Sequence, residues 1–121
     1  MIPKTQPLGP MKWKDTWMGL SDVTLLLEGV PLTLTGARIY LTVYTQKNAA
    51  PVFVCTNVTP NPDIDPSVPI AHNVVIDSSG NFFDINHTVC PLRPGVYWYE
   101  IVVNFANGMV ETPYQGSWTV V

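Results

Sequence analysis

The side chains best suited to nucleophilic or acid–base chemistry in this sequence are His72, His87 and Cys90. A nucleophile needs a general base within hydrogen-bond reach, so Cys90 and His87 are the pair to consider. However, His87 stands between Asn86 and Thr88, and both neighbours favour turns. The sequence offers little other catalytic material. We therefore expect a protein that is not an enzyme and has no catalytic residues.

The ligand types of a blue-copper centre are present in His72, His87, Cys90 and Met109. Such a centre also occurs on β-sandwiches, where Cys, His and Met cluster in one short closing loop. Here Cys90 is followed by Pro-Leu-Arg, which holds no ligand. The spacing therefore predicts that copper is not bound.

Four aspartates offer oxygen ligands for calcium, namely Asp63, Asp65, Asp77 and Asp84. A dedicated calcium loop alternates carboxylates and closes with a bidentate glutamate, and no run in this sequence has that pattern. We expect Asp77 to cap a turn, and Asp63 and Asp65 to be solvated. The sequence thus predicts no metal ion and no other cofactor.

Aromatic rings provide the main alternative chemistry, because Trp and Tyr can form a platform for sugar rings. A domain of this size is expected to bury about two of its four tryptophans simply because they are large. Rings that reach the surface would serve a protein interface equally well, since Trp, Tyr and Arg dominate such contacts. A carbohydrate-binding or adhesion module is therefore the alternative function. The residues concerned are Trp13, Trp17, Trp98, Trp118, Tyr40, Tyr44, Tyr97, Tyr99 and Tyr114.

The charge of the chain is low and slightly negative. Charged residues make up only 12% of the 121 residues, and the net charge is −3. That share is about half of the usual value, which indicates that part of the surface is hidden against neighbouring molecules. With six Lys and Arg residues there is no dense basic face, so we expect no nucleic-acid partner.

The N-terminal segment, residues 1–10, carries three prolines, a lysine and no apolar run. It therefore resembles neither a signal peptide nor a membrane span, and we expect synthesis in the cytoplasm and no membrane partner. In a reducing compartment Cys55 and Cys90 are expected to be buried free thiols, with a disulfide between the two layers as the alternative.

Short segments rich in Val, Ile, Thr, Tyr and Trp lie between prolines and glycines, and no window repeats with helical spacing. The sequence predicts an all-β fold, an immunoglobulin-like (Ig-like) antiparallel β-sandwich of about seven to nine strands, with a barrel as the alternative. It predicts no helix longer than one turn. The expected strands are 12–18, 23–27, 31–34, 37–45, 52–57, 73–76, 82–85, 95–105 and 109–121.

Turn residues predict how these strands connect. Glu28-Gly29, Asp77-Ser-Ser-Gly-Asn81 and Ala106-Asn107-Gly108 are expected to close hairpins. Tyr97 follows Arg93-Pro94-Gly95, which is typical of a tyrosine corner whose hydroxyl bonds back to the backbone. The segment Thr59–Pro69 holds four prolines and is expected to be a long binding loop.

Four segments occur in a notable order: Gly-Val-Pro-Leu-Thr-Leu-Thr-Gly-Ala-Arg-Ile (29–39), Asp-Ser-Ser-Gly-Asn-Phe (77–82), Leu-Arg-Pro-Gly-Val-Tyr-Trp-Tyr-Glu-Ile (92–101) and Gly-Met-Val-Glu-Thr-Pro-Tyr-Gln-Gly-Ser-Trp-Thr-Val (108–120). This order resembles the N-terminal Ig-like domain of tailed-phage baseplate upper proteins and related small virion proteins, over residues 13–121. The resemblance implies a virion structural protein, an adaptor that docks fibres or receptor-binding proteins. It leaves the tail, baseplate, neck and head surface open as its place.

The expected organisation is an extended Pro-rich arm at residues 1–11 and an Ig-like sandwich at residues 12–121. The arm is expected to pack into no core of its own and to order on contact with neighbours, so that deleting residues 1–10 leaves folding intact. The expected partners are other virion structural proteins, with self-association in a ring or another symmetric assembly. The predicted interface residues are Pro3, Pro7, Leu8, Trp13, Ile64 and Val68.

Overall fold

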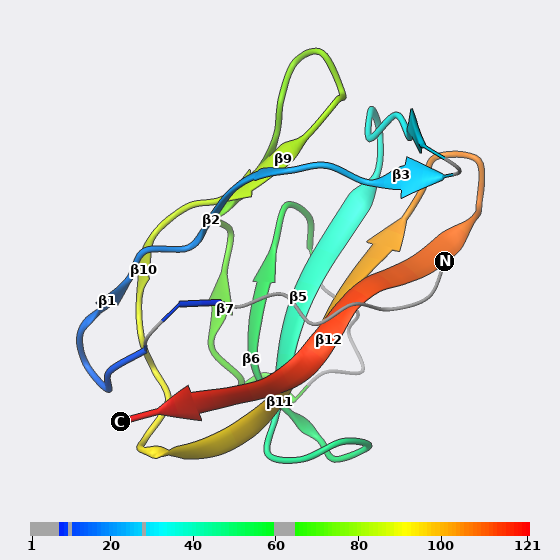
Figure 1. Ribbon diagram of the computed structural model, residues 1–121. Helices are drawn as coiled ribbons and strands as arrows, with labels where there is room; N and C mark the ends of the chain where they lie inside the picture. Colours follow the sequence, from blue (N-terminus) through cyan, green and yellow to red (C-terminus); the bar gives the residue numbers. More distant parts are fainter. Residues whose placement is uncertain (1–7, 10, 28, 60–64) are drawn as a thin grey trace.

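The computed structural model describes residues 8–9, 11–27, 29–59 and 65–121, and every regular element in this part of the chain is a β-strand (Figure 1). The all-β prediction is therefore confirmed. The strands are β1 (Thr16–Trp17), β2 (Leu20–Val23), β3 (Leu26–Leu27), β4 (Val30–Pro31), β5 (Arg38–Tyr44), β6 (Pro51–Thr56), β7 (Ile70–Ala71), β8 (Val74–Ile76), β9 (Phe83–Ile85), β10 (Thr88–Val89), β11 (Gly95–Asn104) and β12 (Val110–Val120).

The larger layer is a five-stranded sheet with the order β12-β11-β5-β6-β7. Its pairs are antiparallel except for β6 with β7, which is parallel. Strand β5 alternates as the sequence predicts: Ile39, Leu41 and Val43 are fully buried on the inner face. Successive side chains of a strand point to opposite faces, so the residues between them lie on the outer face of the sheet.

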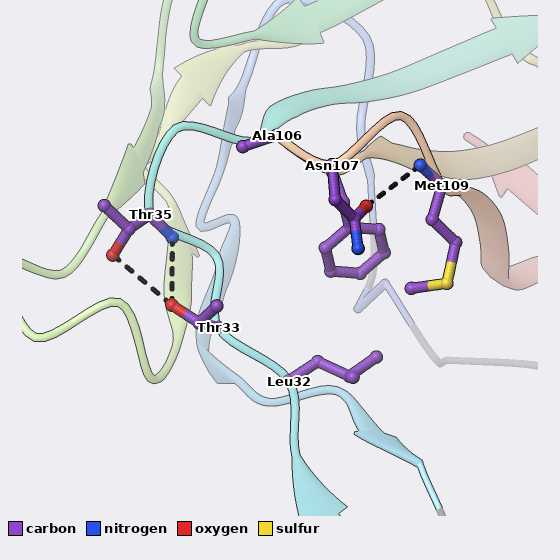
Figure 2. Close-up of a pocket in the computed structure, with 7 residues that line it drawn as sticks. Leu32, Thr33, Thr35, Ala106, Asn107 and Met109 are labelled. Carbon is purple, nitrogen blue, oxygen red and sulfur yellow. Dashed lines mark hydrogen bonds between the residues drawn. The ribbon is translucent and has the colours of Figure 1, made fainter.

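The predicted hairpins are present. Strands β3 and β4 are antiparallel partners, with Leu27 opposite Val30. Strand β8 pairs with β9 across Asp77–Asn81, where Asp77 N–H donates to the Phe82 carbonyl at 2.9 Å. Strands β11 and β12 are joined by a turn in which Asn107 Oδ1 accepts a hydrogen bond from Met109 N–H at 3.0 Å (Figure 2). Gly108 in this turn has φ +91°, a conformation that favours glycine.

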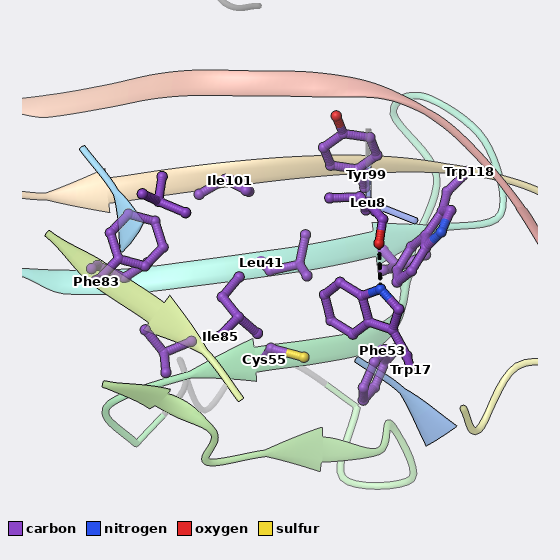
Figure 3. Packing of buried hydrophobic residues seen from close by; sticks show 14 of the residues in the cluster. Leu8, Trp17, Leu41, Phe53, Cys55, Phe83, Ile85, Tyr99, Ile101 and Trp118 are labelled. Atoms are coloured by element: carbon purple, nitrogen blue, oxygen red, sulfur yellow. Dashed lines mark hydrogen bonds between the residues drawn. The ribbon is translucent and has the colours of Figure 1, made fainter. Parts of the chain in front are cut away.

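The second layer consists of the sheet β2-β9-β8 together with the pair β1-β10. Phe83, Ile85 and Trp17 from this layer pack with residues of the five-stranded sheet, such as Leu41 and Ile101, in one buried cluster (Figure 3). Two separate layers around one core are the arrangement of a β-sandwich rather than of a closed barrel.

The part of the chain that the structure describes contains no helix that could span a membrane.

Two tryptophans attach the N-terminal segment to the core. Trp17 and Trp118 meet edge to face with ring centroids 4.8 Å apart. The Trp17 indole N–H donates to the Leu8 carbonyl (Figure 3), and that of Trp118 donates to the Gly9 carbonyl at 3.2 Å. Met11 pairs in parallel with Val120 at the edge of β12. Leu8 and Met11 are 4% and 1% exposed, so this part of the expected arm packs into the sandwich core, contrary to the prediction.

The predicted strand at residues 12–18 is wrong for most of its length. A turn brings Asp15 N–H to the Lys12 carbonyl at 3.0 Å, and Lys14 adopts φ +69°. Only Thr16–Trp17 remains as β1. Trp13 and Trp17, expected on one side, therefore separate: Trp13 is exposed and Trp17 is buried.

Tyr97 and the two cysteines take up the predicted arrangements. The Tyr97 hydroxyl donates to the Arg93 carbonyl at 2.7 Å, which is the bond expected of a tyrosine corner. Cys55 and Cys90 are both buried and free, so the disulfide alternative does not hold.

Candidate interaction surfaces

The predicted interface residues fall into three groups. Pro3, Pro7 and Ile64 lie outside the described residues. Leu8 is buried against the tryptophans of its own chain, so its side chain is not an exposed contact residue. Trp13 and Val68 remain at the surface, and their interface role stays a prediction.

Two cations lie close to the Trp13 ring. The Lys14 ammonium is 4.5 Å from the centre of its ring, and the Arg93 guanidinium carbon is 5.9 Å away. Its backbone N–H donates to the Val121 carbonyl at 3.0 Å, which places Trp13 beside β12, at one edge of the five-stranded sheet. Cation–π contacts of this kind at an exposed site contribute about 0.5–1 kcal/mol.

Val68 is half-buried and lies two residues before the start of β7, at the other edge of the same sheet. It closes a turn in which its N–H donates to the Asp65 carbonyl at 3.0 Å. Hydrogen bonds from Ser67 lower the pKa of Asp65, so this carboxylate caps the turn rather than being only solvated. Trp13 and Val68 thus lie at opposite edges of the five-stranded sheet.

Sequence reasoning missed an apolar cleft at the end of the sandwich where β11 turns into β12 (Figure 2). The cleft has a volume of about 170 Å³ and lies between the 32–35 segment and the 105–109 turn. A hydrogen bond between the Asn107 side chain and Met109 N–H shapes the turn. None of its lining residues is charged; they are Leu32, Thr33, Thr35, Phe105, Ala106, Asn107 and Met109.

Exposed apolar side chains stand on the strands beside this cleft, on more than one face. Leu26 and Val30 project from opposite faces of the β3–β4 hairpin, and Val110, paired with Asn104, projects from the outer face of the five-stranded sheet. Leu26 of β3 is 52% exposed, Val30 of β4 is 65% exposed and Val110, the first residue of β12, is 60% exposed. Figure 1 shows β3 and the turn between β11 and β12 at the same end of the molecule. We call Leu26, Val30, Leu32, Ala106, Met109 and Val110 the apolar end surface.

A second surface lies on the outer face of the five-stranded sheet. Trp98 of β11 is paired with Tyr44 of β5 on one side and with Ser117 of β12 on the other. Its indole N–H donates to Glu100 Oε1 at 3.4 Å, and the Lys47 ammonium lies 5.4 Å from its ring centre. Burial, followed by the negative charge of Glu100, raises the pKa of Tyr44, whereas a hydrogen bond with Thr42 lowers it.

The structure also places some of the residues considered for metal binding and catalysis. In the described part of the chain no three His, Cys, Asp or Glu side chains are grouped to hold a metal ion. Burial raises the pKa of Cys90, whose thiol donates to the Leu92 carbonyl at 3.5 Å. Asp77 caps its turn as predicted: hydrogen bonds from Ser79 lower its pKa.

The fold and these surfaces define a class, a two-layer β-sandwich with an apolar cleft at one end and an aromatic outer face. No family model, curated protein or solved structure matches the chain.

Proposed function

We propose that this chain is a non-enzymatic structural subunit that binds neighbouring protein subunits through the apolar end surface. The observation that carries the proposal is the uncharged cleft of about 170 Å³ with exposed Leu26, Val30 and Val110 on the strands beside it. Exposed apolar side chains around one end of a small domain favour protein contacts, because their burial is worth about 25 cal/mol per Å².

The positions of the two predicted interface residues that remain at the surface support more than one neighbour per subunit. Trp13 lies at the β12 edge, whereas Val68 lies near the β7 edge. A subunit that uses different patches toward two neighbours makes head-to-tail contacts, which close into rings when the rotation permits. A ring or another symmetric assembly is therefore part of the proposal.

The setting that we propose is a tailed-phage particle, with the chain as an adaptor or fibre-docking component in a tail, baseplate, neck or head-surface assembly. The support is the order of the four motifs that resembles the Ig-like domain of baseplate upper proteins. The Tyr97 hydroxyl bond to the Arg93 carbonyl also fits an Ig-like sandwich.

The test uses particles made by the genome that encodes this chain. We expect electron microscopy to show the sandwich in repeated copies, with Val30 and Val110 buried against a neighbouring subunit. Purified particles that lack the chain by mass spectrometry, or that hold it with this surface facing solvent, would overturn the proposal.

A further inference from the structure

We propose that the outer face of the five-stranded sheet around Trp98 binds a neutral sugar residue of an oligosaccharide. This site is separate from the apolar end surface, and it goes beyond the proposed role in assembly. Trp98 lies near the start of β11, whereas the 105–109 turn that lines the end cleft follows the end of that strand.

The strand register creates an aromatic platform. Trp98 and Tyr44 are direct partners on neighbouring strands and project from the same face. Side chains in this relation have their Cβ atoms about 4.5–5.5 Å apart, so the indole and the phenol lie side by side. Both are only half-buried, which leaves ring surface open to a ligand.

An open cleft of about 170 Å³ lies beside Trp98, and Tyr44 is not among its lining residues. Besides Trp98, Val96 and Tyr97, its lining includes Thr45 and Ser117 with their hydroxyls, Gln46 with its amide and Lys47 with its ammonium. These groups supply both donors and acceptors, and a sugar hydroxyl can use either. A few convergent polar groups beside an aromatic surface are typical of a small-ligand site rather than of an apolar protein contact.

The charges of the site favour a neutral ligand. Glu100, bonded to the Trp98 indole, brings one negative charge, and Lys47 above the ring brings one positive charge. An anionic ligand such as a phosphate would be repelled by Glu100, whereas hydroxyls can donate to the carboxylate and accept from the ammonium. Because Lys47 is exposed, it can leave the ring when a sugar stacks there.

The experiment follows the four indole N–H resonances of the ¹⁵N-labelled chain during titration with cello-, malto-, manno- and chito-oligosaccharides. Concentrations up to about 10 mM detect dissociation constants in the millimolar range. We expect at least one of these sugars to shift the Trp98 resonance. The buried Trp17 and Trp118 indoles, bonded to the Leu8 and Gly9 carbonyls, should not move.

Two variants and one control variant complete the test. Trp98→Ala lacks the reporting indole, so its affinity is measured by isothermal titration calorimetry; it should bind roughly tenfold more weakly or worse through loss of stacking. Glu100→Gln should weaken binding while leaving the platform folded, and Trp13→Ala, at the other exposed tryptophan, should bind with unchanged affinity. If no sugar shifts the Trp98 resonance, or if Trp13 and Trp98 respond equally, the sugar site is overturned. Neither result bears on the assembly proposal, which depends on the other surface.

Discussion

Tyr97 stabilises the entry to β11 through one hydrogen bond, from its hydroxyl to the Arg93 carbonyl at 2.7 Å. Tyr97→Phe removes only that hydroxyl, so the free energy of unfolding should fall by about 1 kcal/mol. Urea denaturation measures this difference, and Tyr114→Phe, on the neighbouring strand, is the comparison. An unchanged midpoint for Tyr97→Phe would mean that the corner contributes nothing to stability.

Burial raises the pKa of the Cys55 thiol from 9.0 to about 12. The folded state therefore keeps this proton at a pH where the unfolded state releases it. The resulting contribution of Cys55 to the free energy of unfolding is complete below pH 9. It is lost as the pH rises toward 12, at about 1.4 kcal/mol per pH unit. Unfolding measured from pH 8 to pH 11 should show this slope in the native chain and lose it in Cys55→Ala. Equal slopes in the two proteins would contradict the assignment.

At the residue scale, the sequence predicts best where a pattern repeats. Ile39, Leu41 and Val43 alternate with more polar residues, and all three lie in the core. Leu8 and Met11 stand singly among prolines and polar residues, so no periodicity reveals that they are buried. Their burial depends on tertiary contacts with two tryptophans. Trp17 lies beyond the turn at Lys12–Asp15, and Trp118 lies at the other end of the chain.

The anchored N-terminal segment leads to a prediction at the scale of elements. Removal of residues 1–10 takes away the buried Leu8 side chain and the carbonyl acceptors of two indoles. We expect this truncation to lower the free energy of unfolding by about 3 kcal/mol or more. Removal of residues 1–7 keeps these groups and is the control. Equal thermal stability of the two truncated chains would show that the segment 8–10 is not part of the core.

The approach of β2 to β9 depends on Gly19. A Cβ atom at this position would lie 1.8 Å from the Ile85 carbonyl oxygen, and φ is +79°. Gly29 has nearly the same φ, +80°, with nothing within 4 Å of the added atom. We expect Gly29→Ala to cost only about 1–2 kcal/mol of backbone strain, whereas Gly19→Ala should cost clearly more. Thermal denaturation of both variants tests this, and equal losses would contradict it.

Turn chemistry explains which elements could be predicted. Asn107-Gly108 and Asp77–Asn81 close hairpins as their residue types indicate, because local backbone preferences decide such turns. Strand β7 and its parallel pairing with β6 could not be predicted, since two residues carry no pattern and their partner is set by the fold. The same holds for the turn at Lys12–Asp15, which interrupts a sequence that alternates like a strand.

At the scale of the whole molecule, the two layers and the single core follow from the number and spacing of the apolar segments. The candidate surfaces could not be predicted from the number and spacing of these segments. Leu32 and Met109 meet across the end cleft although they are distant in the sequence, and the pairing of Trp98 with Tyr44 depends on strand register. Neither relation can be obtained from residue types before the topology is known.

The central claim is that the apolar end surface is buried against neighbouring subunits, and one comparison of matched variants tests it most directly. Val110 lies on this surface and is 60% exposed, whereas Val89 of β10 lies elsewhere and is 61% exposed. Both should accept glutamate without loss of fold. A charge buried without a partner at an interface costs several kcal/mol, about 3 or more.

The measurement is the amount of this chain incorporated into purified particles, determined by mass spectrometry for each variant. We expect Val110→Glu to be lost from the particles and Val89→Glu to be incorporated like the native chain. Full incorporation of Val110→Glu would contradict the claim that this surface joins the subunit to its neighbours.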